Sequence, residues 1–292
     1  MSTVAGSASA EHHLVATHDP PPTGIPNPVH DEDGAASAGY SGALVAGVRT
    51  YGWAAEVIIE ALGDRWLADG WVDFTLGRPL FTDDQVTITV APGATADDTW
   101  ELTCRAVTGA AEPRVVLKGT CGRGQALFAA ELDPPAPAPG GVPPAVRAVY
   151  DLDSVPIGTP LVPLSVPVSH GAAARLATED LGIDHLRYTG DEPRVIHPYF
   201  LAARMSPLTR HNFTYGPTIH VRSQIQHCGD ARSGQDLTIN AKIVDAYDRN
   251  GHWYQVLDGT VYGDGDVAFA VLRHHTIFRP RGTTPPPPIT EG

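Results

Sequence analysis

Hydrophobic and polar residues alternate along much of the chain and predict a protein rich in β-strands. In 71–76 and 85–90, for example, apolar residues occupy every second position. Turn residues separate such segments, which is typical of antiparallel sheets. We expect strands at 71–76, 85–90, 100–107, 114–121 and 126–132, then at 218–227, 235–248, 252–262 and 267–278. Asn250-Gly251 predicts a tight hairpin turn between two of them.

A helical spacing of three to four residues appears in one long segment, 41–62, which Gly63 is suited to end. Gly42, Gly47 and Gly52 each weaken a helix by about 1 kcal/mol relative to alanine. Their presence indicates either tight packing inside a curved sheet or the close approach of another group to the helix backbone. Shorter helices are expected at 171–181 and 197–211.

The order of these elements predicts two similar halves, each a helix followed by strands. We expect an α+β protein with a double-hotdog architecture, in which two antiparallel sheets wrap the helices and can join into one continuous sheet. The boundaries are a flexible tail at 1–18, a first half at 19–133, a Pro-rich linker at 134–145, a second half at 146–280 and a Pro-rich tail at 281–292.

The composition removes several classes of function. A formal net charge of −13 opposes nonspecific binding to nucleic acid or to an anionic membrane. Three cysteines without a CxxC pair, no secretory signal and no apolar run of 18 residues favour a cytoplasmic protein without a membrane span. His274 and His275 are adjacent on a predicted strand and face opposite sides, so we expect no metal site.

The candidate chemistry lies between residues 27 and 47. Prolines stiffen the loop that ends at His30, and an imidazole is a competent base at neutral pH. Gly47 lies in the expected helix, where a bare backbone N–H can polarise a carbonyl group. A base that faces such a donor suits acyl-thioester chemistry, so we expect His30 and Gly47 to share one site.

These residues resemble the hydratase motif of the MaoC-like family. The resemblance rests on Asn27-Pro28-Val29-His30, Gly39-Tyr40 and Ala46-Gly47, with weaker similarity in the second half at Ile219-His220-Val221. It implies a hotdog fold and the reversible addition of water to an acyl thioester bound to coenzyme A or to a carrier protein, without a cofactor. It also implies that His30 is catalytic and that the Gly47 N–H binds the thioester oxygen. The further residues expected to bind substrate are Asn27, Tyr40, Ala46 and Arg49.

One position departs from the family pattern. Ile25 stands where the family has its catalytic aspartate, and isoleucine cannot orient or deprotonate water. Three readings stay open at this stage. Asp31 or Asp33 replaces the missing carboxylate; or His30 acts as a single base in a dehydration, an isomerisation or a cyclisation; or the chain is a non-catalytic binding or partner subunit. Pairing of the halves within one chain or across a homodimer is also open.

A group of arginines in the second half is a candidate for binding the phosphates of the thioester carrier. Arg204, Arg210, Arg222 and Arg232 concentrate positive charge in an otherwise acidic protein. His197, which precedes a proline as the first residue of an expected helix, is a weaker candidate for a second active site.

Overall fold

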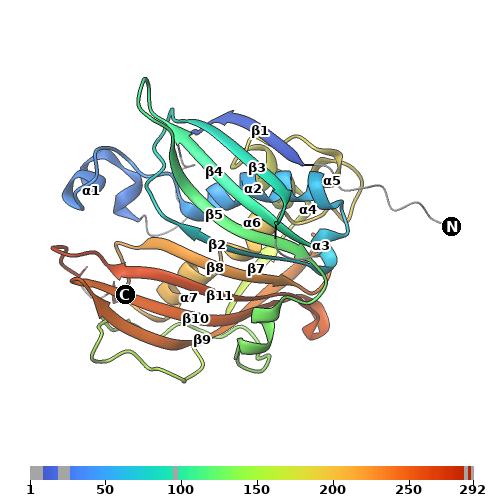
Figure 1. Cartoon of the computed structure of the whole chain (residues 1–292). Helices are drawn as coiled ribbons and strands as arrows, with labels where there is room; N and C mark the ends of the chain where they lie inside the picture. The colour runs from blue at the N-terminus through green and yellow to red at the C-terminus, as the bar shows by residue number, and fades with distance from the viewer. Residues whose placement is uncertain (1–8, 19–26, 95–97, 286–288, 291–292) are drawn as a thin grey trace.

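The computed structural model describes residues 9–18, 27–94, 98–285 and 289–290. Its main feature is a ten-stranded antiparallel sheet in the order β1-β3-β4-β5-β2-β8-β11-β10-β9-β7 (Figure 1). The strands are β1 (Ala10–Val15), β2 (Gly70–Leu76), β3 (Gln85–Pro92), β4 (Thr99–Val107), β5 (Arg114–Arg123), β7 (Leu164–Val168), β8 (Ile219–His227), β9 (Gln235–Arg249), β10 (His252–Tyr262) and β11 (Ala268–Arg279). Two short strands, β6 (Val146–Arg147) and β12 (Ile289–Thr290), form a separate pair.

The two halves of the chain meet where β2 pairs with β8. Trp71 is opposite Gln226 and Thr75 is opposite Arg222 in this antiparallel ladder. The continuous sheet predicted from the sequence is therefore confirmed. The division at 134–145 stays a prediction, although this linker contains no helix or strand.

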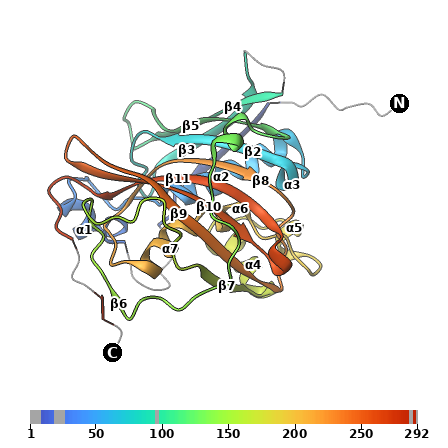
Figure 2. The ribbon, with the colours of Figure 1, turned by 90° about the horizontal axis from the view of Figure 1, so that it is seen from below.

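The helices lie along one side of the sheet (Figures 1 and 2). They are α1 (Glu32–Ser37), α2 (Gly47–Leu62), α3 (Trp66–Asp69), α4 (His170–Thr178), α5 (Leu186–Thr189), α6 (Pro198–Ala202) and α7 (Met205–Asn212), with 3-10 turns η1 (Pro28–His30), η2 (Leu127–Glu131) and η3 (Asp264–Asp266). The ring of Tyr51 on α2 stacks on Phe74 of β2 with centroids 5.0 Å apart. Such fully buried side chains, each stabilising by about 1.5–3 kcal/mol, form the core between α2 and the sheet.

The glycines of α2 are explained by close packing. A Cβ on Gly52 would lie 2.8 Å from Leu181 Cδ2 and 3.1 Å from Tyr199 Cβ, so only glycine lets this part of the chain reach the helix. Gly42 precedes the helix, which starts at Gly47 instead of residue 41. The reason is that 44–45 is held extended: Leu44 bridges to Phe81, and Val45 N–H donates to Leu80 O at 2.9 Å.

Three further expectations are wrong. Residues 10–15 belong to the segment predicted as a tail, but they form the edge strand β1 by pairing with β3. The polar residues of this segment did not indicate a strand, because its partner is distant in the sequence. The segment 126–132 is not a strand but contains the 3-10 turn η2, and the Gln226 and Asp258 side chains accept the flanking N–H groups of Ala126 and Asp133. The helix expected over 197–211 is two helices, α6 and α7. The strand β7 was not predicted, because Pro167 argues against a strand in the sequence. β7 lies at the edge of the sheet, where a proline is tolerated.

Candidate active site

The loop that precedes α2 is fixed to the second half of the chain by Asn27. The side-chain Nδ2 of Asn27 donates to Thr218 O at 2.7 Å, and Thr218 N–H donates back to Asn27 Oδ1 at 3.1 Å. Thr218 directly precedes β8, so this amide joins two segments that are distant in sequence. Pro28 follows at the start of η1, where its missing N–H costs nothing.

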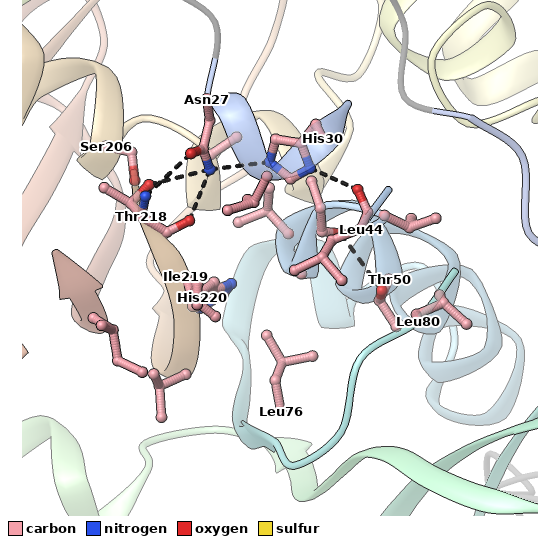
Figure 3. A pocket seen from close by; sticks show the side chains of 18 of the residues that line it. Asn27, His30, Leu44, Thr50, Leu76, Leu80, Ser206, Thr218, Ile219 and His220 are labelled. Atoms are coloured by element: carbon pink, nitrogen blue, oxygen red, sulfur yellow. Dashed lines mark hydrogen bonds between the residues drawn. The ribbon is translucent and has the colours of Figure 1, made fainter. Parts of the chain in front are cut away.

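The hydrogen bonds of His30 determine its tautomer. Nδ1 lies 2.7 Å from Leu44 O, which can only accept, so Nδ1 carries the proton (Figure 3). The other nitrogen, Nε2, then carries the lone pair and lies 3.2 Å from the Asn27 Nδ2 donor. In this form the imidazole has its basic nitrogen at Nε2.

The first turn of α2 supplies bare backbone donors. The first N–H groups of a helix lack partners within it, and among the described residues Gly47 and Val48 donate no backbone hydrogen bond. The helix has 16 residues, and its dipole adds partial positive charge at this end. A Cβ on Gly47 would lie 2.3 Å from Leu76 Cδ1 and 3.1 Å from His220 Nδ1, so β2 and β8 pack directly against this turn.

His30 and Gly47 line the same cavity, which has a volume of about 520 Å³. Its walls come from the loop 27–30, the start of α2, the end of β2, the helices α6 and α7, and the start of β8 (Figure 3). Asn27, Tyr40 and Ala46 also line it. The structure thus brings together five of the six residues that the sequence singled out.

Arg49 is the exception, because its position does not support the expected role in substrate binding. It is buried and does not line the cavity. Its Nε donates to Asp180 O at 2.6 Å and its Nη1 to Thr17 O at 2.5 Å. The guanidinium lies over the ring of Trp53 at 4.9 Å. Arg49 therefore ties the residues after β1 to the loop after α4, a structural role.

Tyr40 is a neutral hydrogen-bond donor at the cavity wall. Burial raises its pKa above the usual 10, and the neighbouring Tyr254 phenol raises it further. Tyr254 lines the cavity too. The Tyr40 phenol keeps its proton at neutral pH, so it can donate to a substrate oxygen.

No Asp or Glu is among the described residues that line the cavity. Asp31 caps α1 instead, accepting from Gly34 N–H at 2.7 Å, and Asp33 is in the first turn of that helix. The reading in which Asp31 or Asp33 replaces the family's aspartate is therefore not supported. Ile25, at the position of that aspartate, lies outside the described residues.

The second half contributes a histidine pair behind Gly47. His220 Nε2 and His274 Nδ1 each lie 2.9 Å from Ser223 Oγ; His274 is buried and His220 is half-buried. Burial lowers the pKa of His220 to about 3 and that of His274 well below 6.5, so both rings are neutral. The sequence predicted that His220 lies on a strand. Only the pairing of β8 with β2 and β11 brings it to the cavity.

His197 does not form a second active site with this cavity. It caps α6 by accepting from Tyr199 N–H at 3.0 Å, and its Nε2 lies 3.2 Å from Glu56 Oε1. It is fully buried and does not line the cavity. Its role is to hold α6 against α2.

The arginine group divides into two. Arg204 and Arg210 line the cavity. Arg222 pairs with Asp73 at 2.6 Å, and Arg232 pairs with Asp230 at 2.8 Å, both away from the cavity. The sequence did not show which of the four arginines would line the cavity.

Solved structures with the same architecture cover most of the chain. A MaoC-like dehydratase is 15% identical, with 93% of this chain and 98% of that chain covered and a TM-score of 0.54. A Mycobacterium tuberculosis protein with a double hotdog fold is 17% identical, with 85% and 86% covered and a TM-score of 0.56. This chain has a double-hotdog fold. The α+β double hotdog predicted from the sequence is thereby confirmed.

The same fold also serves other activities. A protein from Novosphingobium aromaticivorans described as a thioesterase is 13% identical, with 92% and 96% covered and a TM-score of 0.52. No family model matches the sequence, and no curated protein matches it. The activity therefore has to be argued from the cavity itself.

Within the residues that the structure describes, no three His, Cys, Asp or Glu side chains are grouped as metal ligands. No helix in that part of the chain is long and apolar enough to cross a bilayer.

Proposed function

We propose that the chain is a lyase of the hydratase/dehydratase type that acts on an acyl thioester carried by coenzyme A or by a carrier protein. The observation that carries the proposal is the shared cavity of His30 and Gly47, with His30 in the tautomer that has its lone pair on Nε2. A base and a bare helix N–H facing one space are the two groups that removal of an α-proton requires.

In the dehydration direction, His30 Nε2 takes the proton from C2 of a β-hydroxyacyl thioester. The C–H electrons move toward C1, and the resulting enolate oxygen accepts the Gly47 N–H hydrogen bond. The electrons then form the C2–C3 double bond as the C3–O bond breaks, and protonated His30 returns its proton to the leaving hydroxyl group. Water and the enoyl thioester result. One base suffices, which fits a cavity whose described lining has no carboxylate.

The same observation supports a second candidate. An isomerase or cyclase needs the α-proton removed and the enolate stabilised, but no water. Such an enzyme of polyketide-type metabolism would use His30 and Gly47 in the same roles. A thioesterase is less well supported, because among the described lining residues there is no carboxylate to activate water or attack the thioester.

The test is turnover of paired β-hydroxyacyl and 2-enoyl thioesters, followed by the ultraviolet absorbance of the conjugated thioester, together with deuterium uptake at C2 in D2O. Wild-type protein should interconvert the pair, and His30→Ala should lower kcat/KM by about 10²–10⁴-fold. Deuterium uptake at C2 without water addition would favour the isomerase or cyclase. If the wild type shows neither activity, the remaining alternative is a non-catalytic binding or partner subunit.

A further inference from the structure

One wall of the cavity carries two arginines, and no Asp or Glu is among the described residues that line this cavity. Arg204 precedes α7 and Arg210 lies in its last turn. Both side chains are half-buried, and both line the cavity. The chain has 33 acidic residues against 20 basic ones, yet none of the described lining residues is acidic. The cavity is therefore positively charged inside an acidic protein.

Arg204 is held by its inner end only. Its Nε donates to Phe200 O at 3.0 Å, and its guanidinium carbon lies 4.0 Å from the centroid of the Phe200 ring. Among the described residues the Phe200 carbonyl is its one hydrogen-bond acceptor, and the charge of Asp180 also acts on it. Burial lowers its pKa to about 10, against the raising effect of Tyr199 and Asp180, so the group stays charged at neutral pH.

Arg210 is the second arginine of this wall. Its Nε is buried and has no hydrogen-bond partner among the described residues, and the nearest aromatic ring, that of Tyr215, lies 5.7 Å away. Burial lowers its pKa as well. Burying a charge away from its partners is costly, so an anionic ligand that reached these two guanidinium groups would be stabilised by them.

We propose that Arg204 and Arg210 form a subsite for a carboxylate on the acyl group, so that the substrate is the monothioester of a dicarboxylic acid. The inference rests on the proposed function, because it places the thioester carbonyl at Gly47 and the acyl chain along α7. Guanidinium groups bind carboxylates and phosphates alike. The half-buried position favours the carboxylate, since Arg78, which is exposed and lines the same cavity, is better placed for a carrier phosphate.

The test is direct binding to the full chain of two N-acetylcysteamine thioesters of equal length, which contain no phosphate. One acyl chain ends in a carboxylate and the other in its methyl ester. Wild-type protein should bind the carboxylate form at least about 10-fold more tightly. Arg204→Met and Arg210→Met should each remove most of this preference while leaving the affinity for the ester unchanged. Arg204→Lys should keep part of it.

A matched control is Arg175→Met on α4, an exposed arginine that does not line the cavity; it should change neither affinity. Equal binding of the two probes by the wild type would overturn the proposal, and this comparison needs no variant to fold. So would an equal loss of both probes in Arg204→Met. If Arg204→Met weakens only a neutral acyl-coenzyme A and not its N-acetylcysteamine counterpart, the anion is a phosphate and the proposal fails. Carboxylate-dependent binding without turnover would instead reject the lyase and keep the subsite.

Discussion

Asn27 and Thr218 are 191 positions apart in the sequence, but two hydrogen bonds join the side chain of one to the backbone of the other. The remaining N–H of the same amide points at His30 Nε2. A single side chain therefore fixes both the junction of the two halves and the orientation of the base. This arrangement explains why the loop needs an amide, which donates twice and accepts once, at position 27.

Replacing Asn27 by alanine should affect stability and activity together. Loss of the bonds to Thr218 leaves a backbone N–H and a carbonyl without their partners, which should lower the free energy of unfolding by about 1–3 kcal/mol. The base also loses its contact, so kcat should fall. Asn27→Asp should not rescue either, because a carboxylate cannot donate to Thr218 O. Urea unfolding and the turnover assay measure both. Unchanged stability in Asn27→Ala would contradict the role of the amide.

Gly47→Ala should destabilise the protein through a clash, although the backbone N–H survives. The new methyl group would lie 2.3 Å from Leu76 Cδ1, and overpacking of this kind costs about 1–3 kcal/mol. Leu76→Ala removes the clashing atoms. The double variant should therefore be more stable than the sum of the single changes predicts, which a double-mutant cycle of urea unfolding detects. Strict additivity would show that the Leu76 contact is not the cause.

Arg49→Met should lower stability with little effect on substrate binding. The change leaves the Thr17, His18 and Asp180 carbonyl groups without their charged donor, and each such bond contributes about 1.5–3 kcal/mol. Because Arg49 does not line the cavity, KM should change by less than about threefold. Thermal unfolding and steady-state kinetics separate the two effects. A large rise in KM with unchanged thermal stability would restore the role expected from the sequence.

Acid should destabilise the fold through buried histidines. Burial lowers the pKa of His220 to about 3 and that of His227 to about 4, whereas both are near 6.5 in the unfolded chain. Stability from these groups is complete above about pH 6.5 and is lost below it, because only the unfolded state then binds the protons. Each should contribute a loss of about 2 kcal/mol between pH 7 and pH 5.

Urea unfolding at several pH values checks this expectation. His227→Gln removes one of the two groups. The slope of the free energy of unfolding against pH should then fall by the equivalent of about one bound proton over the same range. Stability that is independent of pH between 5 and 7 in the wild type would show that these rings have the same pKa in the folded state as in the unfolded chain.

Much of the candidate site could be predicted from the sequence because its residues lie close together along the chain. The residues Asn27, His30, Tyr40, Ala46 and Gly47 lie within 21 positions of each other, and prolines and glycines limit how the chain between them can fold. In the second half, apolar and polar residues alternate along parts of β8 and β9, and this pattern predicts strands. The Asn250-Gly251 turn is an example: both residues have positive φ, as the predicted hairpin turn requires.

The sequence by itself thus determined the strand faces, the long helix and the group of residues around His30. Tertiary structure alone decided what else surrounds the cavity. Arg204 reaches it while Arg222 does not, and Arg49 is used to hold backbone carbonyl groups. These outcomes depend on which strands pair and which helices pack together, and such long-range contacts are set by the fit of whole surfaces. Local spacing fixes the direction of a side chain within its own element, but not the partner that it meets.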